Sequence, residues 1–242
     1  MATNAAEANA WGQPKGKGQV ILKADRMTAV DGFDPDGRLA PLPAERIDTT
    51  LGVYADYGIT DQLTFQMKGD WQSGEDAFVD YEGRGPVEIG VTWRVIRAER
   101  TAVSLYAGYA DGGEGRNAGY APPGEGDSDW EVRAAVGQSI GETRWSPETF
   151  VELQAARRLR AGLPDETRLD ATIGVRVRKD WMLLGQVFAG RTDGPGAQWV
   201  SVEASLVRDL GDWSLQAGWR QAILGRETPR AGGPVLAIWR RF

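Results

Sequence analysis

The stretch from Gly232 to Phe242, GGPVLAIWRRF, carries the pattern that decides the fold. In an extended chain, successive side chains point to opposite faces. Leu236, Ile238 and Phe242 therefore share one face of this stretch. We expect the run to be a β-strand that continues to the last residue and closes a sheet by pairing with residues 17–30.

The same alternation recurs along most of the chain. In PVEIGVTWRV (86–95) and RLDATIGVRVR (168–178), apolar residues occupy one face and polar or charged residues the other. Most such segments have ten or more residues, the length that a tilted strand needs to cross a bilayer, whereas strands of soluble proteins usually have five or six. Twelve strands are predicted, near residues 17–30, 46–59, 63–73, 85–96, 101–112, 128–141, 149–161, 166–178, 181–192, 198–209, 213–224 and 233–242.

The connections between these segments alternate in length. TDQ (60–62), KD (179–180) and LGD (210–212) are short, whereas DGFDPDGRLAPLPAE (31–45) is long. GETRWSPE (141–148) departs from the rule, because it should be short. Short turns at one end and long loops at the other are typical of a closed antiparallel up-and-down transmembrane β-barrel. A soluble barrel with its apolar face inside has the same periodicity, but the strand length and number favour the membrane.

The last strand also resembles a known signal. A C-terminal Phe242 preceded by Ile238 and Leu236 resembles the motif that the outer-membrane assembly machinery reads on Gram-negative barrel proteins, although Arg240 stands where an apolar or aromatic residue is usual. AWGQPKGKGQVIL (10–22) resembles the mature start of XagA-like outer-membrane proteins, which are associated with exopolysaccharide gene clusters. The resemblance implies a bacterial outer membrane, with lipid, lipopolysaccharide and the assembly machinery as partners.

The N-terminal residues read as the remnant of a leader. ANA, directly before Trp11, has the small-x-small form of a signal-peptidase site. Either a signal peptide was cleaved here or the match is a chance one. In both cases we expect residues 1–10 to be disordered, as a leader remnant would be, and residues 11–242 to form one outer-membrane barrel.

If the apolar face meets lipid, the polar face lines a lumen. The positive charges gather on segments six to eight and the acids on segments one to three, which would set a transverse field across a pore. Alternatively, the charges pair across neighbouring strands and brace the wall. The strand at 181–192 is ambiguous as to which face points inward. The predicted basic wall comprises Arg94, Arg133, Arg158, Arg160, Arg168, Arg176, Arg178 and Arg220, and the predicted acidic wall Asp25, Asp48, Asp56, Asp70 and Glu88.

Composition narrows the function classes. The chain has no cysteine and no histidine, which removes the usual nucleophile–base pairs and the commonest metal ligand. Nothing in the spacing of its acids marks a catalytic pair, and the net charge of -6 argues against nucleic acid. We expect no enzyme, cofactor or metal. Two functions stay open: a narrow porin-like channel for small polar or anionic solutes or an exported glycan, and a non-conducting structural or docking barrel that assists an export complex.

Overall fold

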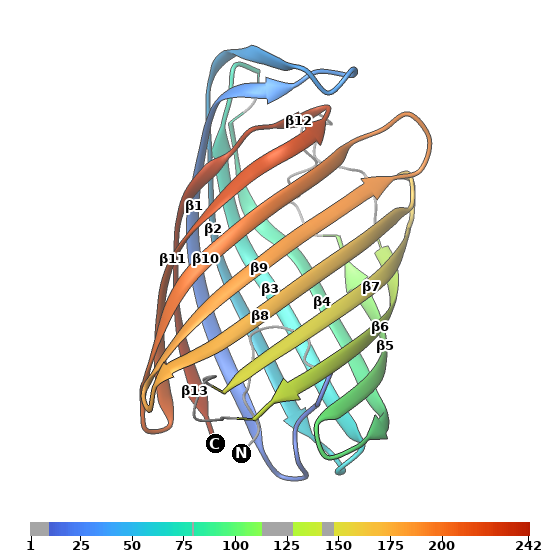
Figure 1. Cartoon of the computed structure of the whole chain (residues 1–242). Helices are drawn as coiled ribbons and strands as arrows, with labels where there is room; N and C mark the ends of the chain where they lie inside the picture. Colours follow the sequence, from blue (N-terminus) through green and yellow to red (C-terminus); the bar gives the residue numbers. More distant parts are fainter. Residues whose placement is uncertain (1–9, 79, 113–127, 142–147) are drawn as a thin grey trace.

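The chain forms a closed antiparallel β-barrel (Figure 1). The structure is a computed structural model that describes residues 10–78, 80–112, 128–141 and 148–242. Within these ranges the barrel has twelve long strands and one two-residue strand, β12, and no helix that is long and apolar enough to cross a membrane. The strands are β1 (Gly18–Phe33), β2 (Leu39–Gly58), β3 (Leu63–Glu75), β4 (Asp80–Arg97), β5 (Thr101–Asp111), β6 (Ser128–Ile140), β7 (Thr149–Arg160), β8 (Glu166–Arg178), β9 (Trp181–Thr192), β10 (Gln198–Leu210), β11 (Trp213–Arg226), β12 (Thr228–Pro229) and β13 (Gly232–Arg241).

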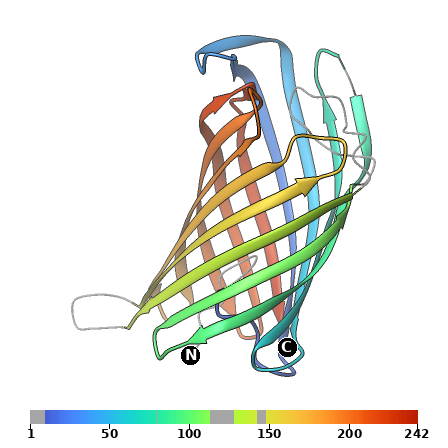
Figure 2. The same ribbon diagram turned by 90° about the vertical axis from the view of Figure 1, so that its right-hand side faces the viewer.

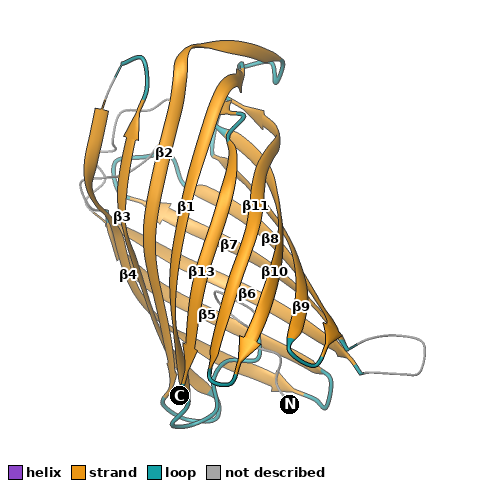
Figure 3. Cartoon of the chain, turned by 90° about the vertical axis from the view of Figure 1, so that its left-hand side faces the viewer, coloured by secondary structure: helices purple, strands orange, loops and turns teal. Residues whose placement is uncertain are grey.

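The barrel closes through its first strand. β1 pairs with β2 on one side and with β13 on the other, and each remaining long strand pairs with its neighbours in sequence (Figure 3). In hydrocarbon an unpaired backbone N–H or C=O costs several kcal/mol, so closure removes an edge that could not be tolerated there. The predicted pairing of residues 233–242 with residues 17–30 is therefore present, for example between Leu22 and Ile238.

The two ends of the barrel differ. The short connections, the start of β1 and Phe242 lie at one end, which we call the turn end, and the longer connections lie at the other, the loop end (Figure 1). The β1–β2 hairpin rises beyond the other strands at the loop end (Figures 1 and 2). Residues 39–45, which were predicted as loop, belong to β2. The turn before them is tight: Asp34 Oδ1 accepts a hydrogen bond from the backbone N–H of Arg38, and Gly37 adopts a positive φ of +76°. The connection at 141–148 falls mostly outside the described residues.

The outward face is apolar. Its exposed side chains include Leu51, Phe65, Ile89, Val91, Leu105, Val132, Leu153, Leu169, Ile173, Leu206, Leu215 and Leu236. Tyr109 and Trp130 stack edge to face on this surface, with ring centroids 5.2 Å apart. A soluble barrel would bury this set inside, so the pattern is that of a wall facing lipid. Trp199 and Trp239 do not belong to it, since Trp199 lines the interior and Trp239 is fully buried there.

The register resolves the ambiguous strand. In β9, Met182 and Leu184 are buried inside the barrel, whereas Leu183 is about half exposed on the outer wall. Leu183 lies opposite Leu206 of β10, which is also outward. Apolar residues therefore occupy both faces of β9 near the turn end, which is why period-two alternation could not orient it.

Candidate functional site: the barrel lumen

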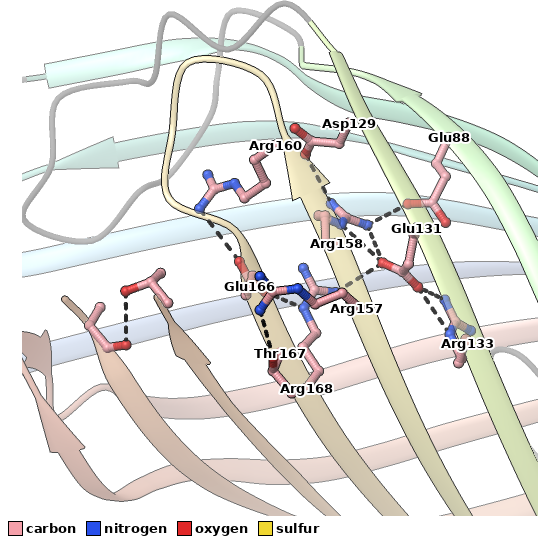
Figure 4. Close-up of polar contacts among 12 residues, drawn as sticks. Glu88, Asp129, Glu131, Arg133, Arg157, Arg158, Arg160, Glu166, Thr167 and Arg168 are labelled. Atoms are coloured by element: carbon pink, nitrogen blue, oxygen red, sulfur yellow. Dashed lines mark hydrogen bonds and ion pairs between the residues drawn. The ribbon is translucent and has the colours of Figure 1, made fainter. Parts of the chain in front are cut away.

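The middle of the lumen is crossed by a network of ion pairs centred on Arg158 of β7 (Figure 4). Its guanidinium contacts Glu88 of β4, lies 2.7 Å from Glu131 of β6 and 3.6 Å from Asp129. The Arg158 side chain is 8% exposed and those of Glu88 and Glu131 are 2% exposed. Period-two alternation places all four side chains inside, and their charges compensate one another where water is scarce.

Glu131 and Glu88 each bind further cations. Arg133 donates to Glu131 through Nε at 3.0 Å, and Arg168 Nη1 lies 3.8 Å from the same carboxylate. Lys68 Nζ lies 3.2 Å from Glu88, which also accepts the Tyr106 hydroxyl at 2.7 Å. The central charges are thus shared among several partners and are fixed in position.

A second, smaller network lies on the strands near the seam. Glu203 of β10 accepts Arg220 Nη2 at 2.8 Å and Gln216 Nε2 at 3.1 Å. Lys23 Nζ of β1 lies 3.6 Å from Glu203. In this network the guanidinium of Arg220 lies over the ring of Phe188, and in the central network that of Arg133 lies over the ring of Tyr106. In both pairs Cζ is 4.7 Å from the ring centroid.

Two cavities of about 380 and 310 Å³ lie between these networks and share several lining residues. We call them together the central chamber. The larger cavity is lined by four basic and two acidic side chains, namely Lys68, Arg133, Arg168, Arg220, Glu88 and Asp170. The aromatic rings of Tyr54, Tyr106, Phe188 and Trp199 complete its wall. Guanidinium groups next to aromatic faces can bind carboxylates, phosphates and the ring faces of sugars.

An apolar cluster appears in the lumen toward the turn end. A buried cluster occupies the interior there, comprising Ile21, Tyr54, Phe150, Met182, Leu184, Val207, Ala237 and Trp239, with Trp11 packed against it. Trp239 and Phe150 are its largest fully buried members. The inner face of the wall is therefore polar around the chamber and mixed below it, where the apolar cluster lies beside buried polar residues such as Gln19, Asp56 and Ser214.

The N-terminal segment lies inside this end of the barrel. The Ala10 N–H donates to Glu152 of β7 at 2.7 Å, and the Gln13 N–H donates to Thr64 of β3 at 2.8 Å. Arg94 of β4 donates to the backbone carbonyl of Trp11. The indole of Trp11 meets Phe150 edge to face, with centroids 6.1 Å apart. We call residues 10–17 the N-terminal plug: residues 10–13 are tied to three strands inside the barrel, and residues 14–17 are exposed at the turn end.

Two glycines allow these rings to lie against the wall. A Cβ at Gly137 of β6 would collide with the indole of Trp11, and a Cβ at Gly174 of β8 would collide with the ring of Phe150. A strand residue without a side chain permits close approach at the cost of strand propensity. The two glycines thus create the space that the plug and its neighbour occupy.

The structure divides the predicted basic wall. Arg133, Arg158, Arg168 and Arg220 meet at the chamber, as described above. Arg160 lies near the loop end, 3.5 Å from Glu166. Arg94 and Arg176 lie at the turn end, where Arg176 donates to Asp209 at 2.9 Å. Arg178 differs, because a register shift after Arg176 pairs it with Trp181, and it is exposed on the outer wall.

The predicted acidic wall is also divided. Asp25, Asp70 and Glu88 line the chamber. Asp48 accepts Arg46 Nε at 2.7 Å near the loop end, and Asp56 accepts the Gln19 side chain at 3.0 Å at the turn end. Within the described ranges, no group of three or more acidic side chains is arranged to hold a metal ion.

Sequence reasoning missed several residues of the site. Asp129 lies two residues before Glu131, and Glu166 lies two residues before Arg168, so each shares the inward face of its strand. Both could have been found by extending the inward alternation of these strands by one more position toward the strand start. The plug had no such signal, since Trp11 precedes the first predicted strand and directly follows the predicted leader remnant. Carboxylates on β6 and β8 make the predicted basic wall a mixed network.

The residues of the predicted assembly signal face outward. Leu236 and Phe242 are each more than half exposed, and Ile238 lies opposite Leu215 on the outer wall. Phe242 stacks on Tyr57 of β2, with centroids 6.5 Å apart, across the start of β1. Whether this strand acts as an assembly signal stays a prediction.

Comparison with known proteins identifies the fold. No family model and no curated protein matches the chain. Its structure is similar to the COG4313 outer membrane channel from Pseudomonas putida F1, with a TM-score of 0.72 and 13% identity over 99% of this chain and 100% of that one. It is also similar to the KdgM porin, with a TM-score of 0.59 and 7% identity over 93% of this chain and 99% of that one. For the NanC porin the TM-score is 0.53 and the identity 7%, over 90% of this chain and 97% of that one. The chain therefore has the fold of outer-membrane β-barrel channels.

Proposed function

We propose that this chain is a channel that passes small polar or anionic solutes through a narrow charged lumen. The observation that carries the proposal is the central chamber, where basic side chains outnumber acidic ones and line a cavity of about 380 Å³. A focused positive potential in a low-dielectric wall raises the local concentration of anions. Structural similarity to channels and porins supports this role over an enzymatic one.

The apolar outer wall supports a place in the bacterial outer membrane. Strands of ten or more residues between short turns and longer loops span a bilayer when tilted. In this placement the turn end faces the periplasm and the loop end the exterior. Lipid and lipopolysaccharide then surround the wall, and Leu236, Ile238 and Phe242 are the residues through which the assembly machinery would recognise the chain.

An acidic or hydroxyl-rich glycan is the larger solute that the chamber could accept. A solved structure of the KdgM porin contains disordered oligogalacturonate. Guanidinium forks and aromatic faces suit both the carboxylates and the ring faces of such a chain. Export of a glycan, which the XagA-like N-terminal stretch suggested, belongs to the same proposal.

The N-terminal plug favours a second function. Residues 10–13 lie inside the turn end, where Ala10 and Gln13 are hydrogen-bonded to the wall, so we infer that passage of a solute requires the plug to move. A barrel in which the plug is permanent would serve as a structural or docking component instead. The two functions differ in one measurable property, which is conductance.

Single-channel recording in planar bilayers separates them. Trp11→Ala removes an aromatic contact that typically contributes about 0.5–1.5 kcal/mol, so we expect the open probability to rise about two- to tenfold. Trp130→Ala is the matched control, because that indole stacks on Tyr109 outside the barrel. If neither the wild-type protein nor Trp11→Ala conducts, the docking function is favoured.

A further inference from the structure

A row of two arginines and a tryptophan lies on the outer wall at the turn end. In the register of the sheet, Trp181 of β9 stands opposite Arg178 of β8 on one side and opposite Arg208 of β10 on the other. The guanidinium of Arg208 lies over the indole, 5.2 Å from its centroid. Neighbouring strands are about 4.8 Å apart, so the three side chains span about 10 Å.

In the described part of the chain, no carboxylate pairs with the two positive charges of this row. Among the described residues, neither Arg178 nor Arg208 forms an ion pair, although both are exposed on an otherwise apolar face. A neighbouring pair shows the contrast. Arg240 also lies over an indole, that of Trp213, but its Nη1 is 2.8 Å from Asp212, and this arginine holds the pKa of Asp212 below its usual range.

An apolar groove begins at the row and runs away from it along the wall. It encloses about 670 Å³ and includes Trp181 and Arg208 at one end. Small residues make its floor, since Ala24 and Ala217 flank Leu236 in one row of the sheet. Its remaining outer lining is formed by Leu22, Leu51, Leu206, Leu215 and Ile238.

We propose that the row and the groove bind one phospholipid molecule. The headgroup phosphate lies between the guanidinium groups of Arg178 and Arg208, the indole of Trp181 sits at headgroup level, and one acyl chain follows the groove. Guanidinium forks match phosphate oxygens, tryptophan prefers the membrane interface, and small side chains leave room for a chain that larger ones would exclude.

The bound phospholipid belongs to the periplasmic leaflet of the membrane. This step rests on the membrane placement proposed above, in which the turn end faces the periplasm. Lipopolysaccharide occupies the opposite leaflet, so its phosphates do not reach this row. An arginine that faces lipid is tolerated far better at the interface than at the midplane, which is consistent with the position of Arg178 beside the Lys179–Asp180 turn.

Native mass spectrometry with phosphatidylglycerol tests the proposal on the full chain in mild detergent. We expect the wild-type protein to retain one phosphatidylglycerol molecule per barrel. Arg178→Gln/Arg208→Gln should weaken this binding about thirtyfold, from the usual contribution of each arginine near an anionic lipid surface. Arg240→Gln is the matched control, because Asp212 already neutralises that arginine, and it should bind as the wild type does.

Two further arms make the outcome decisive. Ala217→Trp fills the groove and should also release the lipid while leaving both arginines in place. Free inorganic phosphate should not compete, since the acyl chain supplies part of the affinity. Unchanged phosphatidylglycerol binding by the double arginine variant, with a correctly folded barrel verified by circular dichroism, would overturn the proposal. The channel proposal would stand in that case, because it depends on conductance alone.

Discussion

Replacement of Arg158 by methionine tests the role of the central network. The guanidinium sits between Glu88, Glu131 and Asp129, whose side chains are at most 2% exposed. Breaking a buried ion pair by removing one partner typically costs 3–5 kcal/mol, because a charge is left without compensation. Here Glu131 keeps two other arginines and Glu88 keeps a lysine and a tyrosine hydroxyl. We therefore expect the lower end of that range, about 3 kcal/mol of unfolding free energy.

The assay is guanidinium-induced unfolding in phospholipid vesicles, followed by tryptophan fluorescence. Arg84→Met is the matched control, because the Arg84–Asp111 pair also joins neighbouring strands but its side chains are 45% and 54% exposed, and such a pair contributes about 0–1 kcal/mol. Arg158→Met/Glu131→Gln should not recover the loss, because Arg133 and Arg168 would then lose the carboxylate that they share. An equal, small effect in Arg158→Met and Arg84→Met would refute the reasoning.

Three further outcomes are expected. Arg176→Gln, which removes an inward cation at the turn end, should lower the preference of the open channel for chloride over potassium by up to about fivefold, and reversal potentials measure it. Arg191→Gln, on the outer wall opposite Thr167, should leave the reversal potential unchanged. Leu153→Arg places a charge on the lipid-facing side of β7 and should cost about 2–4 kcal/mol in vesicle unfolding, whereas a loss below 0.5 kcal/mol would contradict the assigned outward face.

The strands could be predicted because one physical constraint repeats along the chain. A wall with lipid on one side and polar lumen on the other imposes period-two alternation, and the twelve predicted segments correspond to the twelve long strands. The same constraint located Arg133, Arg158 and Arg168 on the inner face. Because these charged side chains share the inner face of neighbouring strands, they lie close enough to form ion pairs with one another.

What alternation could not reveal are the places where it fails. The register shift after Arg176 turns Arg178 outward, and nothing in RVR marks it. The apolar cluster gives β9 and β13 apolar residues on both faces, so Trp239 could not be told from an interfacial tryptophan. Trp11 lies before the first strand, and only the three-dimensional structure shows that it returns into the barrel.

The central claim is that a chamber lined by more basic than acidic side chains lies inside a wall whose apolar face meets lipid. The most direct test is the reversal potential of single Trp11→Ala channels in a planar bilayer under a potassium chloride gradient. We predict that the current through Trp11→Ala channels is selective for chloride. This selectivity should be lost when Arg133→Gln and Arg220→Gln are added to the same chain. A cation-selective current, or selectivity unchanged by those two substitutions, would contradict the account.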